Sequence, residues 1–408
     1  MTDSLLASAA RLTAANHNAL AYVRARAGRE RVSSRARIGR ALSAAGVPAG
    51  VAAVDDLCAA MRRVGVVTVN FHPDRLLPDG RSVAEALYEE GTYRNQFETR
   101  ISNGGLTAFP GGDRDRWEEA VFGGAYQAPG VRDWERPKYG GLDLMNYSDG
   151  ACPRFGSCHL RLAPETLGRS TFSFGDSARE PQDVGTIDAF EPVLAALLES
   201  VGRDGRALGR PGLSLAQFVE RLLGTRAPGA GLFERAEGRA VDEYIEAQIH
   251  GAVKVATDVE ALVIDPSFRR TRTGELLLAT AERCGLETEW HPGFVLTASE
   301  VPRDAPARDA ASPPPLPRWQ AFCAGGRAAR LAARVIADHA ADRHCLDAAA
   351  IGRAAVSAVQ DPEEWQEWGS ARETLQCLKD LWLILVAFGR SGSAAAAPGV
   401  ERRHRDRA

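Results

Sequence analysis

One stretch, residues 244–250, constrains the fold of this chain more than any other. Ile245, Ala247 and Ile249 are apolar, and the residues between them are polar. Successive side chains of a β-strand point to opposite faces, so the alternation predicts a strand with one face on a hydrophobic core. The other face then carries the remaining side chains, Tyr244, Glu246, Gln248 and His250. Such a polar row suits a wet or ligand-filled cleft, and it equally suits a half-exposed antiparallel strand.

Other segments are predicted to surround this strand with further strands and with helices. A β-branched run over 64–71 indicates a buried strand that ends at His72-Pro73, because proline cannot donate to a sheet. Further strands are expected at 157–162, 170–174 and 259–264, the last paired with a strand over 244–255. Apolar residues at helical spacing are found over 4–64, 186–223 and 318–390. Residues 91–150, rich in glycine and aromatic side chains, are expected to form ordered loops. Together these patterns favour an α+β fold.

The chain is expected to divide into several units, because 408 residues are many for one hydrophobic core. Residues 1–63 are predicted to form an N-terminal helical region, and residues 64–300 the core that carries the site. A proline-rich linker is expected over 301–317, and a C-terminal helical region over 318–390. Residues 391–408 are expected to be a disordered tail.

Charge, cysteine content and the length of the apolar runs argue against several classes of protein. The formal net charge of −3 offers no broad basic surface for nucleic acid. The seven cysteines are odd in number and irregularly spaced, which favours reduced thiols over a disulfide framework. No apolar run approaches the roughly 20 residues that a membrane-spanning helix needs, and no secretion signal is evident at the N-terminus. We therefore expect a cytoplasmic protein without a membrane partner.

Two further features suggest a ligand site. His72, at the end of a predicted strand, could hydrogen-bond a ribose hydroxyl or act as an acid–base group, or it could simply cap the turn. Glycines beside aromatic residues recur at 103–106, 122–126 and 138–141. Glycine lets the backbone approach a ligand and tyrosine can stack on a planar ring, although tight turns with aromatic packing explain the same pattern.

Taken in chain order, these motifs resemble the ADP-ribosyltransferase superfamily, especially its poly(ADP-ribose) polymerase-like branch. The resemblance covers residues 64–270 and includes Asn70-Phe71-His72, the stretch 101–106, Phe122-Gly123-Gly124-Ala125-Tyr126 and Glu243-Tyr244-Ile245-Glu246. It implies a split β-sheet core with helical extensions, NAD as substrate and an acceptor of unknown identity. The activity it implies is mono-ADP-ribosyl transfer or NAD hydrolysis, without a metal.

The same resemblance implies roles for individual residues. Glu246 would stabilise the positive charge that develops on the ribose, and His72 would hold the ribose of the adenosine half. Contacts to NAD are implied for Asn103, Gly104, Tyr126, Tyr139 and Ser170, with the two tyrosines flanking the nicotinamide ring. Gln248, His250 and Arg75 would orient the acceptor. A second branch of the superfamily, which uses an arginine, a Ser-Thr-Ser strand and a glutamate, would instead employ Arg75 or Arg94 with Ser170-Thr171.

Two departures from the superfamily pattern stand out. Pro73 follows the histidine where the superfamily usually has a glycine whose N–H grips the nicotinamide amide. Glu243 and Glu246 also compete for the catalytic position. Alignment on Glu243-Tyr244-Ile245 favours Glu243, whereas strand alternation favours Glu246 because it places Glu243 on the apolar face.

Most of the chain is also similar to a bacterial family of unassigned function. The shared stretches lie at 93–99, 109–114, 154–157 and 246–251. This similarity supplies no activity by itself.

The sequence is also compatible with two other functions. A metal-dependent hydrolase could gather five side chains on one divalent ion: His72, Asp74, His250, Asp265 and His291. Their spacing matches no metal motif on a single helix. A non-enzymatic interaction protein built on a degenerate fold is the third possibility.

Overall fold

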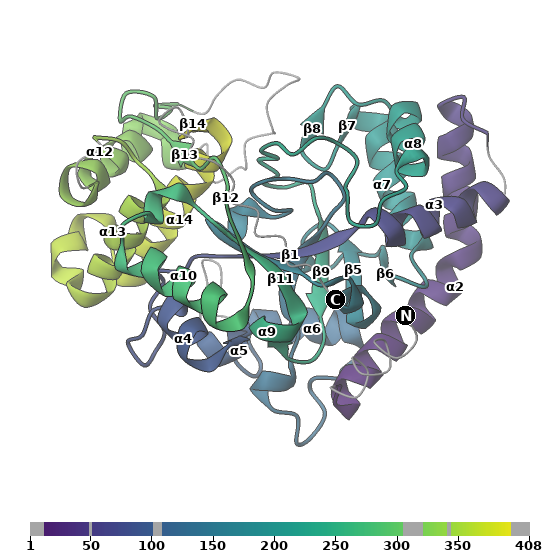
Figure 1. The fold of residues 1–408 in the computed structure, drawn as a ribbon, viewed down its shortest axis with the longest axis horizontal. Coiled ribbons are helices and arrows are strands. Elements are labelled where there is room, and N and C mark those ends of the chain that lie inside the picture. Colours follow the sequence, from purple (N-terminus) through teal and green to yellow (C-terminus); the bar gives the residue numbers. More distant parts are fainter. Residues whose placement is uncertain (1–11, 49–50, 101–107, 305–320, 341–343, 393–408) are drawn as a thin grey trace, which may run out of the picture.

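The computed structural model describes residues 12–48, 51–100, 108–304, 321–340 and 344–392 (Figure 1). The α-helices are α2 (Ala14–Ala44), α3 (Val51–Val64), α4 (Val83–Glu90), α5 (Gln96–Thr99), α6 (Asp113–Phe122), α7 (Glu191–Asp204), α8 (Leu215–Gly224), α9 (Val255–Asp258), α10 (Arg272–Cys284), α12 (Arg327–His339), α13 (Ala348–Gln360) and α14 (Ala371–Phe388). The strands are β1 (Val66–Phe71), β2 (Thr92–Tyr93), β3 (Lys138–Asp143), β4 (Cys158–Leu162), β5 (Ser170–Phe174), β6 (Val184–Thr186), β7 (Arg206–Ala207), β8 (Arg210–Pro211), β9 (Ile245–Ile249), β10 (Val253–Lys254), β11 (Val259–Ile264), β12 (Glu287–Trp290), β13 (Phe294–Val295) and β14 (Arg390–Ser391).

The centre of the molecule is one eight-stranded sheet. Its strand order is β12-β11-β4-β1-β3-β9-β5-β6, with β11 and β12 parallel and all other neighbours antiparallel. The expected mixture of helices and strands is confirmed. The expected split into two half-sheets is not what the hydrogen bonds show, since all eight strands belong to a single sheet.

One face of this sheet is apolar and meets the main hydrophobic core. Ile245, Ala247 and Ile249 of β9 belong to this core, together with Phe172 of β5. Helix α7 packs against β5 and β6, and α10 packs against β11. Burial of these side chains removes apolar surface from water and fixes which face of β9 points inward.

The opposite face carries polar side chains, and over β1, β3 and β9 it is contacted by α6 and by residues 149–156. Gly141 of β3 makes this covering possible, because a Cβ at this position would overlap the Sγ of Cys152 and lie 2.8 Å from the Cβ of Ala151. The segment 149–156 therefore rests directly on the sheet.

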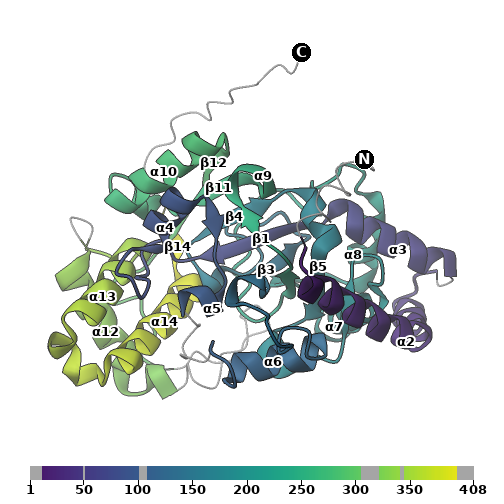
Figure 2. The same cartoon turned by 90° about the horizontal axis from the view of Figure 1, so that it is seen from below.

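Helical groups lie at both ends of the molecule, α2 and α3 at one end and α12–α14 at the other (Figure 2). Helix α2 packs along α7. The C-terminal helices enclose Trp365 and Trp382, and their apolar side chains belong to the same core cluster as those of the sheet. No described helix combines the length and apolar character that crossing a bilayer requires.

Comparison with the expected elements shows where local patterns suffice. The strand over 170–174 is confirmed and the first strand begins at Val66. The strand expected over 244–255 is shorter, ending at Ile249, and its pairing with 259–264 is wrong because β3, β1 and β4 lie between β9 and β11.

The segment 91–150 is not made of loops alone, because it contains helix α6 and strand β3. Helix α6 is mostly charged and β3 contains two glycines, so neither has the apolar periodicity from which an element is predicted.

Candidate functional site

The polar face of β9 carries a row of buried, hydrogen-bonded side chains. Glu246, Gln248 and His250 are at most 3% exposed. Tyr139 of β3 and Thr171 of β5 lie opposite Gln248 in the sheet. The row is therefore neither a water-filled cleft nor a half-exposed surface, because protein groups provide its hydrogen bonds.

Glu246 is the acidic centre of this row. Its Oε1 accepts a 2.9 Å hydrogen bond from the Nε2 of Gln248, and its Oε2 accepts a 3.4 Å bond from the backbone N–H of Ser177. Burial, together with the nearby charge of Asp176, raises the pKa of Glu246 to about 7. Both protonation states are thus accessible near neutral pH.

Helix α6 places a second acid, Glu118, over the polar face of the sheet. The Oη of Tyr139 donates a 2.9 Å hydrogen bond to Oε1 of Glu118, and the guanidinium of Arg114 lies 4.6 Å from the centroid of the Tyr139 ring. Arg136 forms a 2.8 Å ion pair with Glu118. Within the part of the chain that the structure describes, Nε of Arg114 is buried without a hydrogen-bond partner.

His250 closes the row at the end of β9. Its Nδ1 lies 2.5 Å from the Oη of Tyr126, and its Nε2 lies 3.0 Å from the Oγ1 of Thr171. Burial lowers the pKa of His250 to about 3, so the ring is neutral. The rings of Tyr126 and His250 are nearly parallel with centroids 6.0 Å apart.

These contacts correct the role expected for Tyr126. It is 1% exposed and its hydroxyl is bonded to Asn16 and His250, so it is part of the packed network rather than one side of a ring-binding cleft. Tyr139 remains partly exposed.

The structure does not bring His72 to Glu246. Both residues belong to the same sheet face, but Glu246 is level with Thr68 through Gly141, and His72 lies four residues further along. Strand spacing and rise place their Cα atoms roughly 16 Å apart. The expected convergence on one cavity is therefore wrong.

The segment 149–156 fills the space between them. The backbone N–H of Ala151 donates to Thr68 Oγ1 at 2.9 Å, and Asn70 donates to the carbonyl of Asp149 at 2.8 Å. His72 itself packs against Trp382 of α14, and burial holds its pKa well below the usual value.

Other expected site residues also lie elsewhere. Ser170 lies level with Ile249 on the apolar side of the sheet and donates to the carbonyl of Thr166 at 2.8 Å, so strand alternation removes it from the site. Arg75 follows Asp74, whose carboxylate abuts Gly352 of α13, away from β9. Asn103 and Gly104 lie outside the described residues.

The two competing glutamates are now distinguished by position. Glu243 lies before β9 and binds Arg206 at 2.8 Å and the N–H of Gly209 at 3.0 Å. It is partly exposed, so its expected place on the apolar face is wrong. Glu246 is the glutamate of the buried row.

The five residues of the expected metal site are dispersed. His250 lies in the β9 row. Asp265 and His291 are 3.6 Å apart and follow β11 and β12, at the far edge of the sheet. Among the described residues, no three His, Cys, Asp or Glu side chains are grouped to hold a metal ion.

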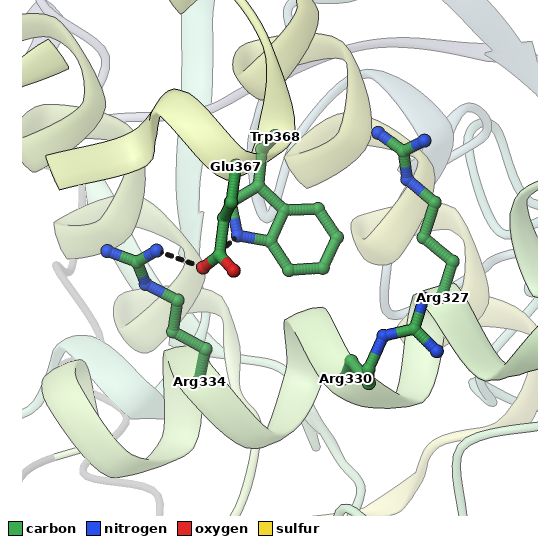
Figure 3. A pocket seen from close by; sticks show the side chains of 5 residues that line it. All are labelled: Arg327, Arg330, Arg334, Glu367 and Trp368. Carbon is green, nitrogen blue, oxygen red and sulfur yellow. Dashed lines mark hydrogen bonds and ion pairs between the residues drawn. The ribbon is translucent and has the colours of Figure 1, made fainter. Parts of the chain in front are cut away.

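A pocket of about 460 Å³ lies among the C-terminal helices, between α12 and the 3-10 turn Pro362–Trp368 (Figure 3). Its lining consists of Arg327, Arg330, Arg334, Glu367 and Trp368. Glu367 is ion-paired with Arg334 and donors dominate the lining, so it offers no acid–base pair. We place the candidate site at Glu246 instead, where a buried acid has a perturbed pKa.

Three residues around the row were not expected from the sequence: Asn16, Arg114 and Glu118. Thr171 was expected only through the second branch of the superfamily. A usable signal existed for Thr171, because alternation within 170–174 places Thr171 and Ser173 on one face. Asn16 gave only a local signal, a helix-capping pattern with Thr13.

Comparison with known proteins completes this description. No curated protein matches the chain. Residues 66–388 match the family described as "Protein of unknown function (DUF3626)", and they include the sheet, Glu246 and the C-terminal helices. The chain is a member of the DUF3626 family.

Proposed function

We propose that this protein cleaves the nicotinamide–ribose bond of NAD and transfers ADP-ribose to an acceptor or to water. The observation that carries this proposal is Glu246, a buried carboxyl group in mid-strand with a pKa of about 7. The superfamily resemblance of residues 64–270 supplies the substrate, and strand alternation favours Glu246 over Glu243 for the catalytic glutamate in that resemblance.

The chemistry suits a carboxylate at this place. Cleavage of the bond between the ribose C1′ and the nicotinamide nitrogen gives an oxocarbenium-like state, and the bonding electrons leave with the ring. The carboxylate of Glu246 would stabilise the positive charge on the sugar. An acceptor hydroxyl or water then forms a bond to C1′, and its proton passes to Glu246. A group titrating near neutral pH is suited to that transfer.

Neighbouring residues would bind the rest of the substrate. Arg114, Tyr139 and Asp176 are partly exposed beside Glu246 and mark the direction from which a ligand would reach it. The guanidinium of Arg114, with its unpaired buried Nε among the described groups, is suited to a diphosphate. Tyr139 offers a ring face for the nicotinamide. His72 and Tyr126 do not contact the substrate in this version of the site.

The test is incubation of the full chain with NAD and measurement of released nicotinamide. Glu246→Gln should lower the rate by at least about 100-fold, since a positioned acid–base group contributes about 10²–10⁴-fold. Glu243→Gln is the matched control and should keep the wild-type rate. Equal rates in wild type and Glu246→Gln would overturn the proposal. Saturable NAD binding without nicotinamide release would instead indicate a binding protein.

A further inference from the structure

We infer that helix α2 is part of this site and that Asn16 is a positioning residue for Glu246. Five consecutive hydrogen bonds connect the two side chains through Tyr126, His250, Thr171 and Gln248. Helix α2 precedes the residues that match the family, so the inference reaches beyond the family match.

The first amide in the chain has a fixed orientation. The Oδ1 of Asn16 accepts from the backbone N–H of Thr13 at 3.0 Å, as part of the capping box of α2. The Nδ2 therefore faces the carbonyl of Glu135 at 2.7 Å and the Oη of Tyr126 at 3.1 Å. A backbone carbonyl can only accept, so this end of the amide must be the donor.

That donor sets the direction of the next two bonds. Because the Oη of Tyr126 accepts from Asn16, its single proton is available for Nδ1 of His250, 2.5 Å away. A neutral imidazole carries one N–H, which must then be on Nε2 and point at Thr171, 3.0 Å away.

The direction continues to the carboxyl group. Thr171 accepts from His250 and donates to Oε1 of Gln248 at 2.8 Å. The Nε2 of Gln248 then donates to Oε1 of Glu246 at 2.9 Å and to Oγ of Ser173 at 3.2 Å. The amide thus presents donors to Glu246, which favours the carboxylate.

Because the members of the chain are buried, water cannot replace them and the donor–acceptor direction of the hydrogen bonds is preserved. Asn16, His250, Thr171 and Gln248 are 0% exposed, and Tyr126 is 1% exposed. In a hydrogen-bonded chain without water, exchanging donor and acceptor at one side chain requires the same exchange at each side chain that follows. A reversed chain would turn the Oε1 of Gln248 toward Glu246 and disfavour the carboxylate.

Other groups act on Glu246 from the elements around it. They are Asp176 at the start of the 3-10 turn Ser177–Arg179, Arg114 of α6, Tyr139 of β3, Tyr244 before β9, and Cys152 in the segment 149–156, with Arg154 beside Cys152. Among the described residues, the hydrogen bonds of Asn16 reach Thr13, Tyr126 and Glu135 and none of these side chains, so a change at Asn16 tests the chain.

The experiment uses Asn16→Asp, which keeps the shape of the side chain and, when the new carboxyl group is ionised, replaces its donor with an acceptor. Asn18→Asp is the matched control, because Asn18 is exposed on the same helix. Nitrogen-15 NMR of the full chain reads the His250 tautomer, assigned with a His250→Gln variant, and carbon-13 labelling of glutamate reads the titration of Glu246.

The wild-type chain and Asn18→Asp should carry the His250 proton on Nε2. In Asn16→Asp, Tyr126 should donate to the new carboxylate, the His250 proton should move to Nδ1, and the amide of Gln248 should turn over. The pKa of Glu246 should then rise by about one pH unit or more, since a donor is replaced by an acceptor.

Three results would overturn the inference. One is a wild-type His250 with its proton on Nδ1. Another is a folded Asn16→Asp with an unchanged tautomer at a pH at which the new carboxyl group is ionised. If Asn16→Asp does not fold, Thr171→Val interrupts the chain with a side chain of nearly the same shape, and an unchanged pKa of Glu246 in that variant is the third.

Measurement of the His250 tautomer and of the Glu246 titration requires no substrate. The two measurements therefore distinguish failure of this inference from failure of the proposed function. The catalytic consequence rests on the proposed function. If NAD is cleaved, Asn16→Asp should lower kcat and leave KM unchanged, because Asn16 acts through Glu246 and does not touch the substrate.

Discussion

The imidazole of His72 packs edge-on against the indole of Trp382, with ring centroids 5.2 Å apart and planes at 80°. The indole Nε1 in turn donates to the carbonyl of Pro153 at 2.9 Å. This arrangement joins the end of β1, the segment 149–156 and α14. It assigns His72 to packing rather than to the site at Glu246.

We therefore predict that His72→Phe, which keeps an aromatic ring against Trp382, leaves nicotinamide release unchanged. His72→Ala should lower the free energy of unfolding by about 1–3 kcal/mol, because it removes the ring contact. Urea denaturation followed by tryptophan fluorescence measures the second effect. Loss of NAD cleavage in a stable His72→Phe would return His72 to the site.

Stability should depend on pH through Glu246. Its pKa is about 7 in the folded chain and about 4.3 in an unfolded one. The contribution of this group to stability is therefore full below about pH 4 and is lost as pH rises through about 7. Glu246→Gln removes that loss, so its unfolding free energy relative to wild type should rise between pH 4 and pH 8, by up to roughly 3 kcal/mol.

Denaturant unfolding at both pH values measures this difference. Glu243→Gln is the control, because it removes the same charge from the partly exposed pair with Arg206. Its unfolding free energy relative to wild type should not rise between pH 4 and pH 8. A constant difference for Glu246→Gln across the range would show that the folded chain does not disfavour the carboxylate.

Gly141 should tolerate no side chain. Gly141→Ala would push a Cβ into Cys152 and Ala151, and it should cost about 1–3 kcal/mol of unfolding free energy. Gly28→Ala, in mid-helix of α2 with open space around it, should instead stabilise by about 0.5–1 kcal/mol. Thermal unfolding compares the two. A neutral Gly141→Ala would mean that the segment 149–156 is not pressed against the sheet.

The ion pair of Arg136 with Glu118 should be important for folding. Both side chains are buried, at 6% and 1% exposure, and Arg136 also pairs with Asp115 at 2.7 Å. Arg136→Leu therefore removes the guanidinium from two acids and should cost about 3–5 kcal/mol. Burial already raises the pKa of Glu118, so the deficit should shrink as pH falls and the acid is protonated.

Arg116→Leu on α6, the helix of Glu118, removes an exposed pair with Asp113 and a hydrogen bond to the carbonyl of Gly111, and it should cost under about 1 kcal/mol. Equal costs for Arg136→Leu and Arg116→Leu, measured by denaturant unfolding, would contradict the importance of the buried pair.

The sequence by itself determined the local features of this protein. Alternation over 244–250 correctly separated Ile245, Ala247 and Ile249 from Glu246, Gln248 and His250, because the two faces of a strand follow from backbone geometry alone. The strand 170–174 followed for the same reason.

Only the tertiary structure decided which strands are neighbours and what lies between them. Strand β9 pairs with β3 and β5, not with β11, and the segment 149–156 separates Glu246 from His72. Asn16 reaches Tyr126 from 110 positions away. Such contacts depend on how whole elements pack, and the periodicity of a short stretch carries no information about its distant partners.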